Sequence, residues 1–316
     1  MPPVPLVRVI RSGVEESIHY GSVAVVDAGG RVVASAGDVG RVAFARSSMK
    51  PLQATVSLDL AGEEVTDREA AVMCASHNGE PVHLQAVTSL LDRAGLGLDA
   101  LQTPPSRPLD PEAAAQVPEP RPELHNCSGK HAGMLLACVR RGFDPLSYLE
   151  PDHPLQESVL EAVRRAAGQD PVSIGVDGCG VPVHALPLAS MATLYARLAA
   201  GRVSGSDRVL EAMRAEPYLV AGRDRVCTAV MESAPGVAVK TGAEGMMCAA
   251  LPDRGVGLAL KVEDGAARAA DPAVVHALSL LGAVDPEAIP KFSRPPVLGG
   301  GRPVGHLEAV FTLDPA

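Results

Sequence analysis

Aromatic residues are scarce in this sequence, which contains no tryptophan and only four phenylalanines and four tyrosines among 316 residues. Hydrophobic residues nevertheless make up 47% of the chain, so a well-developed core must be built mainly from alanine, valine, leucine and methionine. Charged residues make up 21%, a composition typical of a globular protein and unlike that of a disordered one.

Several kinds of functional segment are also missing. No apolar run reaches the roughly 18 residues that span a bilayer, so no membrane association is expected. No basic patch interleaved with aromatic residues occurs and the net charge is −9, so nucleic acid is not expected as a partner. The segment from Met1 to Arg11 lacks a basic stretch followed by a long apolar one, so no signal peptide is expected.

The cysteines are widely scattered, and no two of them form a Cys-x-x-Cys pair. In a chain without a secretion signal, this spacing favours a reducing compartment over a disulfide framework. We therefore expect a cytoplasmic protein with free thiols. The six cysteines are Cys74, Cys127, Cys138, Cys179, Cys227 and Cys248.

Strand patterns occupy both ends of the chain. Residues 6–12 and 20–36 are rich in apolar residues, and the turn sequence at residues 27–30 predicts a hairpin. A helix is expected over residues 271–281 and a last strand over residues 306–313. Three apolar runs between glycine-rich turns predict an antiparallel meander, over residues 236–240, 246–251 and 256–262.

Helical patterns dominate the middle of the chain. A helix is expected to begin near Ser47 with Pro51 in its first turn, where the missing N–H does little harm. Residues 103–122 are rich in proline and predict a loop. Further helices are expected over residues 67–96, 129–141, 154–167, 184–200 and 206–215.

The order of strands, helices and strands predicts an α+β fold in which the terminal segments form one antiparallel sheet with a helical lobe inserted between them. We expect a single catalytic domain with a sheet lobe, about residues 1–60 and 220–316, and a mainly helical lobe, about residues 61–219. An active site is expected where the lobes meet.

The first group of reactive residues is Ser47 and Lys50. At positions i and i+3 of a helix their Cβ atoms would be about 5–6 Å apart, and an amine with a lowered pKa can activate a serine hydroxyl. Ser-x-x-Lys alone is a weak motif that occurs by chance. Ser48 could be mistaken for the nucleophile, but only Ser47 has the i+3 relation to Lys50.

Two further motifs follow in order, Ser76-His77-Asn78 and Lys240-Thr241-Gly242. The series Ser-x-x-Lys, Ser-x-Asn and Lys-Thr-Gly is that of penicillin-binding proteins and class A β-lactamases. Taken singly, the second motif could be a helix cap or turn and the third a strand end. Together they predict that Ser76 relays a proton with the support of Lys240, and Lys261 is a rival for that lysine.

Two glycine-rich polar turns, His125 to Met134 and Gly175 to Pro182, precede helical patterns, where backbone N–H groups could hold an anion. Cys127, Lys130 and Cys179 could converge there, together with His131 and Asp177. The spacing is not that of a zinc finger, and lone cysteines are more often buried hydrophobic residues. The residues alone therefore leave a metal site and a packed core both open.

These motifs together resemble those of the bacterial L-asparaginase II family of the rhizobial type, over about residues 40–265. The resemblance rests most specifically on the two cysteine-containing turns. It implies a fold similar to that of serine β-lactamases and hydrolysis of L-asparagine to L-aspartate and ammonia. It also implies two Ser–Lys tandems, which are Ser47 with Lys50 and Ser76 with Lys240.

The resemblance further implies a zinc ion held by Cys127, Lys130 and Cys179. For the substrate it suggests Arg46 at the α-carboxylate and Asp177 at the α-amino group. The alternatives are a surface salt bridge for Arg46 and a turn residue for Asp177. His131 could contact the substrate or orient a ligand, and Asn78 is a further expected substrate contact. A homodimer is expected by analogy. The alternatives are another amide or ester hydrolase on the penicillin-recognising scaffold and a non-catalytic amino-acid-binding protein, and the sequence does not distinguish asparagine from glutamine.

Overall fold

The computed structural model describes residues 1–316 and divides into two compact units. The first unit consists of residues 1–48, 186–200 and 229–316, and the second of residues 49–185 and 201–228. The helical part is thus inserted between segments that form the sheet, and this confirms the predicted α+β class. None of the helices combines the length and the hydropathy that crossing a bilayer would require.

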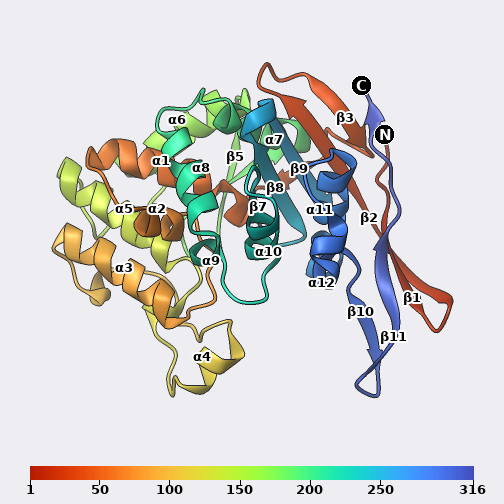
Figure 1. The fold of residues 1–316 in the computed structure, drawn as a ribbon. Coiled ribbons are helices and arrows are strands. Elements are labelled where there is room, and N and C mark those ends of the chain that lie inside the picture. Colours follow the sequence, from red (N-terminus) through yellow and green to blue (C-terminus); the bar gives the residue numbers. More distant parts are fainter. The chain divides into compact units, whose positions relative to one another are not determined.

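The first unit is built on one antiparallel sheet whose main path runs β10-β11-β1-β2-β9-β8-β7, and β3 pairs with both β2 and β12. Figure 1 shows the N-terminal strands in red beside the C-terminal strands in blue. The strands of this sheet are β1 (Val4–Arg11), β2 (Val14–Asp27), β3 (Val32–Ala36), β7 (Ala238–Thr241), β8 (Met246–Leu251), β9 (Val256–Val262), β10 (Pro296–Gly299), β11 (Arg302–Ala309) and β12 (Asp314–Pro315). The short strand β4 (Val42–Phe44) belongs to this unit but lies outside the sheet.

The long strand β2 connects the two ends of the chain in this sheet. It pairs with β1 along its first half and with β9 from Gly21 to Asp27. The predicted hairpin turn follows at Asp27, whose carboxylate accepts the N–H of Gly29 at 2.9 Å and whose carbonyl accepts the N–H of Gly30 at 2.9 Å. Such side-chain acceptance is the usual way in which aspartate fixes a turn.

Helices cover this sheet closely. All residues of β8 are buried, which requires a layer on each face of the strand. The helix α7 (Leu188–Ala199) packs on β2, β8 and β9, and α11 (Ala267–Leu280) packs on β1, β8, β9 and β11. A Cβ at Gly257 would lie 2.1 Å from the carbonyl oxygen of Ala192, so glycine is what allows α7 to approach β9. Two shorter helices are α10 (Val226–Ser233) and α12 (Pro290–Ser293).

The second unit is a helical bundle around α5, whose residues from Ser128 to Cys138 are all buried. This helix packs on α1 and α3 and also contacts α2, where a Cβ at Gly129 would lie 2.2 Å from the carbonyl oxygen of Val72 (Figure 1). The elements are α1 (Lys50–Ala61), α2 (Asp67–Met73), α3 (Pro81–Ala94), α4 (Pro111–Ala115), α5 (Ser128–Arg141), α6 (Pro154–Ala167), α8 (Ser206–Ala215), α9 (Pro217–Val220), and the strands β5 (Ser173–Val176) and β6 (Pro182–Pro187).

Some predicted boundaries differ from the observed ones. The helix expected to begin at residue 184 begins at Leu188, because β6 precedes it and pairs with β5. The stretch 67–96 contains two helices separated by an irregular segment. The division between the units falls after Ser48, earlier than the predicted boundary near residue 60, and α7 belongs with the sheet against which it packs.

Candidate active site

Ser47 lies in a tight 3₁₀ turn, Arg46–Met49, that leads directly into α1. Arg46 has a φ of 50°, in the left-handed region that non-glycine residues seldom adopt because the Cβ is crowded there. Residues held in this conformation concentrate at functional sites. The backbone immediately before the predicted nucleophile therefore has the strained geometry typical of a catalytic turn.

The two adjacent serines have different surroundings. Ser48 is 1% exposed, and its hydroxyl donates to the carbonyl oxygen of Ala45 at 2.5 Å. The carbonyl of Ser48 in turn accepts the hydroxyl of Tyr195. Ser47 is only half-buried, so part of this residue is exposed. This difference supports Ser47 over Ser48 as the nucleophile.

Lys240 lies on β7 in the same unit and is fully buried. In the sheet it is opposite Cys248, whose thiol bonds to Ser48 and is influenced by the Lys240 charge. Burial raises the pKa of Cys248 to about 12, so this thiol stays protonated. Cys248 therefore interacts with both Lys240 and the serine turn, and it does so as an uncharged thiol.

Gly242 brings the Lys-Thr-Gly segment against the same turn. A Cβ at this position would lie 3.0 Å from the carbonyl oxygen of Ala45 and 3.0 Å from the Cβ of Met246, tighter than ordinary contacts. Burial lowers the pKa of Lys261, and the charges that act on this residue include those of Glu263 and Arg41. The packing thus places the Lys-Thr-Gly segment against the residue that precedes the serine turn.

Lys50 begins α1 in the second unit and is 1% exposed. Its Nζ contacts three oxygens: the carbonyl of Ala75, the carbonyl of Asn126 at 3.3 Å, and the hydroxyl of Ser76 at 3.1 Å. An ammonium would donate to all three, whereas a neutral amine could donate to the two carbonyls and accept the Ser76 proton. The arrangement can therefore pass a proton between Lys50 and Ser76, a pairing that the sequence did not predict.

Backbone hydrogen bonds hold Ser76 in this position. Its N–H donates to Val220 at 3.0 Å, the N–H of His77 donates to Asn126 at 3.2 Å, and the N–H of Asn78 donates to Ala221 at 2.8 Å. The irregular segment that carries Ser76 is thereby fixed on both sides. Strand-like pairing of this kind leaves little freedom for the hydroxyl to move away from Lys50.

Asn78 and His77 lock this segment with their side chains. The amide nitrogen of Asn78 donates to the carbonyl of Arg223 at 2.9 Å, and its oxygen accepts from Arg225 at 2.9 Å. The Nε2 of His77 lies 2.9 Å from the hydroxyl of Ser128, and burial lowers the pKa of His77 well below its usual range. Asn78 was predicted to bind substrate; in this structure its amide is already engaged at both ends.

The predicted metal ligands converge in the second unit. Cys127 caps the N-terminus of α5, Lys130 follows in its first turn, and Cys179 lies in the turn between β5 and β6. The Nζ of Lys130 is 2.9 Å from the Sγ of Cys179, and the two thiols are hydrogen-bonded to each other. All three side chains are buried. The tertiary fold thus joins two segments that are distant in sequence into one cluster.

The charges in this cluster depend on one another. The bond from Cys179, together with the Lys50 and Lys130 charges, holds the pKa of the Cys127 thiol well below its usual range, and the same bond raises the pKa of Cys179. Burial acts to lower the pKa of Lys130, but the charges of Cys179 and Cys127 outweigh it and raise the pKa. The lowered pKa of Cys127 and the raised pKa of Lys130 both favour a thiolate beside an ammonium.

Two sulfur donors and one nitrogen donor fit a zinc ion, which prefers such ligands. No group of three or more His, Cys, Asp and Glu side chains is arranged to hold a metal, so the set reaches three donors only through Lys130. Asp177 stands beside this set, with its Oδ2 3.8 Å from the Sγ of Cys179, and is half-buried. Its carboxylate is a suitable partner for an ammonium group.

His131 lies one turn after Cys127 on α5 and is completely buried. Its Nδ1 is 2.7 Å from the hydroxyl of Tyr148, a residue that the sequence analysis did not single out. Burial, and then the Lys130 charge, lower the pKa of His131 well below its usual range and favour the uncharged ring. Tyr148 carried no sequence signal because nothing in its local pattern shows which side chain it will meet.

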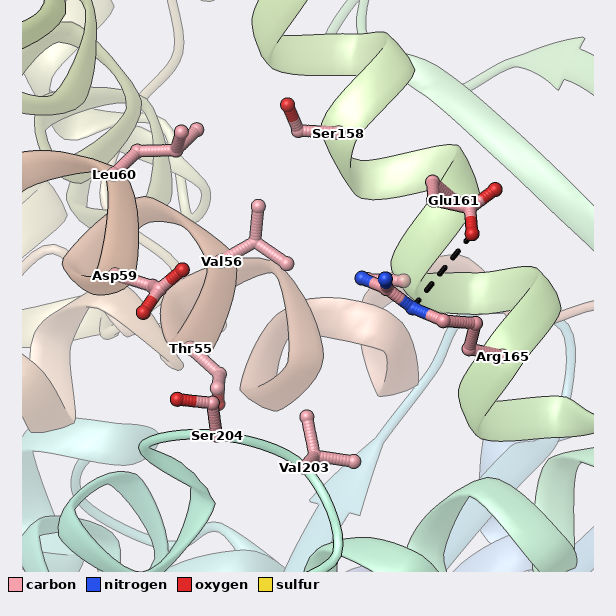
Figure 2. A pocket seen from close by; sticks show the side chains of 10 residues that line it. Thr55, Val56, Asp59, Leu60, Ser158, Glu161, Arg165, Val203 and Ser204 are labelled. Carbon is pink, nitrogen blue, oxygen red and sulfur yellow. Dashed lines mark ion pairs between the residues drawn. The ribbon is translucent and has the colours of Figure 1, made fainter.

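A cavity of about 260 Å³ lies elsewhere in the second unit, between α1, α6 and residues 203–204 (Figure 2). Its wall includes Asp59 and an ion pair of Glu161 with Arg165 at 3.7 Å. None of the predicted catalytic, substrate-binding or metal-binding residues lines it. The cavity is therefore separate from the reactive residues.

The sequence matches a family model described as L-asparaginase II over residues 7–309. No curated protein matches it significantly. Similar solved structures include Mglu, 15% identical over 82% of this chain with a TM-score of 0.46, and Mglu in its glutamate form, 15% identical over 84% with a TM-score of 0.47. This chain spans 66% and 61% of those two chains, less than two thirds of each. A β-lactamase from Mycobacterium bovis is 16% identical over 84% of this chain and 95% of its own, with a TM-score of 0.37.

Proposed function

Because the chain belongs to the L-asparaginase II family, a family of amidohydrolases, we propose that it hydrolyses the side-chain amide of L-asparagine to L-aspartate and ammonia. The observation that best supports this proposal is the buried Lys50 amine, held by two carbonyl oxygens with its remaining contact on the Ser76 hydroxyl. A protein that only binds amino acids gains nothing from burying a lysine against a serine in this way.

In the proposed reaction the Oγ of Ser47 attacks the amide carbon and the hydroxyl proton moves to Lys50. The N–H of Ser47, at the start of a 3₁₀ turn, is a natural donor for the oxyanion. The C–N bond then breaks and ammonia leaves with a proton delivered through Ser76, supported by Lys240. Water next attacks the ester, a proton returns to Ser47 Oγ, and aspartate is released.

Substrate recognition is assigned to charged groups on both sides of the α-carbon. We assign Asp177 to the α-ammonium group, since its carboxylate is half-buried beside the cluster. Arg46 is assigned to the α-carboxylate, since it adjoins Ser47 and is partly exposed. A glutamine side chain is one methylene longer, and a hydrophobic or fixed-distance site discriminates such a difference by about 10–200-fold.

We propose that Cys127, Lys130 and Cys179 hold a zinc ion. When bound, such an ion supplies a fixed positive charge and Lewis acidity beside the substrate site. The residues themselves would keep Lys130 neutral and both sulfurs ionised in that state. They would also tie α5 to the turn between β5 and β6, which carries Asp177.

The direct test of the activity is ammonia release from purified protein supplied with L-asparagine, with L-glutamine, or with a chromogenic β-lactam. We expect turnover of asparagine, slower turnover of glutamine, and no acylation by the β-lactam. Rapid opening of the β-lactam without ammonia release from asparagine would instead support the penicillin-recognising alternative. Ligand-induced thermal stabilisation with no turnover would support a binding protein.

The metal assignment predicts that Cys127→Ser and Cys179→Ser lose zinc. Wild-type protein dialysed against zinc and then against buffer should retain about one zinc per chain by elemental analysis, and either variant should retain much less, because a serine hydroxyl is a poor zinc ligand. Cys138→Ser is the matched control, since that buried thiol lies outside the cluster and should leave the zinc content unchanged. Equal zinc content in all four proteins would contradict the assignment.

A further inference from the structure

Tyr148, His131 and the backbone of Gln102 form a buried hydrogen-bonded chain in the second unit. Tyr148 and His131 are both completely buried. The N–H of Gln102 donates to the hydroxyl oxygen of Tyr148 at 3.2 Å, and that oxygen lies 2.7 Å from the Nδ1 of His131. The aromatic rings of Tyr148 and His131 meet edge to face, with centroids 5.6 Å apart.

The direction of these hydrogen bonds fixes the tautomer of His131. The Tyr148 oxygen already accepts the Gln102 N–H, so its own proton needs an acceptor, and the Nδ1 of His131 is the one within reach. If Nδ1 carried the proton instead, the phenolic proton would have no acceptor among these contacts. With Nδ1 accepting the phenolic proton, the ring carries its own proton on Nε2.

The Nε2 atom of His131 is buried and has no hydrogen-bond partner in the protein. Buried N–H groups are nearly always paired, so an unpaired one calls for an acceptor from outside the chain. His131 follows Cys127 by four residues on α5, which places the two on the same helix face, and the charges of Lys130 and Lys50 act on its ring. The unpaired donor therefore belongs to the region of the reactive residues.

We propose that His131 donates an Nε2–H hydrogen bond to an oxygen atom of the bound amino-acid substrate, and that Tyr148 is the positioning residue that fixes the required tautomer. This inference rests on the proposed function for the identity of the ligand. It requires no proton transfer by His131, which acts only as a neutral, oriented donor. Tyr148 acts entirely through His131 and does not touch the substrate.

The tautomer can be measured without turnover. In protein labelled with ¹⁵N-histidine, long-range ¹H–¹⁵N spectra should show His131 with its proton on Nε2, assigned by comparison with His131→Gln. Addition of L-aspartate, the proposed product, should shift the Nε2 resonance of His131. In Tyr148→Phe the same ring should show a mixture of tautomers and a smaller response to aspartate.

The kinetic test replaces His131 with amide residues whose side-chain nitrogen takes the place of one imidazole nitrogen only. The amide nitrogen of His131→Gln approximates Nε2, and that of His131→Asn approximates Nδ1, so the glutamine variant should keep at least tenfold more kcat/KM than the asparagine variant. Tyr148→Phe should lose about tenfold in kcat/KM, mainly through KM. His153→Gln is the matched control, because both nitrogens of that buried histidine are paired, with Leu155 and Asp144, and its kinetics should stay unchanged.

Each result bears on the proposal separately from the asparaginase assignment. An Nδ1–H tautomer in the wild type, or equal activity of the glutamine and asparagine variants, would overturn the inference even in an active asparaginase. A protein that releases no ammonia from asparagine but shows the Nε2–H tautomer and a His131 shift with aspartate would overturn the activity and keep the donor. Absence of any His131 shift at saturating aspartate in an active enzyme would also overturn it.

Discussion

Replacement of Ser47 by alanine is expected to lower kcat for asparagine by about 10⁴-fold or more, because no acyl-enzyme can form without the hydroxyl. The fold should be unaffected, since Ser47 is only half-buried and its side chain fills no core position. Ammonia release under saturating asparagine measures the activity, and a thermal melt confirms that the protein is folded.

The neighbouring residue gives the matched control for this variant. Ser48→Ala removes a buried hydroxyl that donates to Ala45, so it should cost about 1 kcal/mol of stability and leave kcat within about tenfold of the wild type. If Ser48→Ala were inactive and Ser47→Ala active, the nucleophile would be Ser48. If both retained full activity, the covalent mechanism would be wrong.

Lys50→Met is expected to have the second-largest effect, with a fall in kcat of about 10²–10⁴-fold, the usual contribution of a general base. Methionine fills most of the buried space that the lysine side chain occupies, but it cannot exchange a proton with Ser76. It also leaves the buried carbonyl of Ala75 without the Lys50 donor, at the cost of about 1–3 kcal/mol that an unpaired buried group carries. The carbonyl of Asn126 keeps the N–H of His77 as its donor. Both activity and melting temperature should therefore fall.

Lys261→Met is the control for Lys50→Met, because it removes a buried lysine that the proposed mechanism does not use as a proton carrier. Lys261 is 7% exposed in the first unit, and its amine donates to the carbonyl of Val262, the next residue along the chain. Stability should fall modestly and kcat should stay within about threefold of the wild type. A loss of activity in Lys261→Met as large as in Lys50→Met, with Lys240→Met active, would show that Lys261 is the second catalytic lysine.

Much of the secondary structure follows from local sequence. The helix predicted over residues 154–167 is α6, and the one predicted over residues 206–215 is α8, because a clear helical period marks both. The meander of β7, β8 and β9 was also predicted, since apolar runs separated by glycine turns leave few alternatives. The short strands β10 and β12 were not, because neither has enough residues to show a period.

The sequence identified several of the reactive residues but not all of the contacts between them. The motifs identified Ser47, Lys50 and Ser76 as a group, and the structure adds that Lys50 contacts Ser76 directly. The sequence suggested a substrate contact for Asn78, whereas the structure shows its amide bound between Arg223 and Arg225. Hydrogen bonds between segments more than a hundred residues apart have no local signal, so such roles emerge only when the chain is folded.

The sequence by itself determined the α+β class, the position of the serine turn, and which serine, lysine and cysteine side chains are candidates for reaction. These features follow from the hydrophobic period, the turn residues and the motif spacing, all of which act over short distances along the chain. Only the tertiary structure decided which of these groups meet. It brought Cys179 to Lys130 across 49 residues and Tyr148 to His131 across 17, and it turned Ser48 inward while Ser47 stayed accessible. The physical reason is that burial, charge and hydrogen-bond direction at each group depend on neighbours that packing alone supplies.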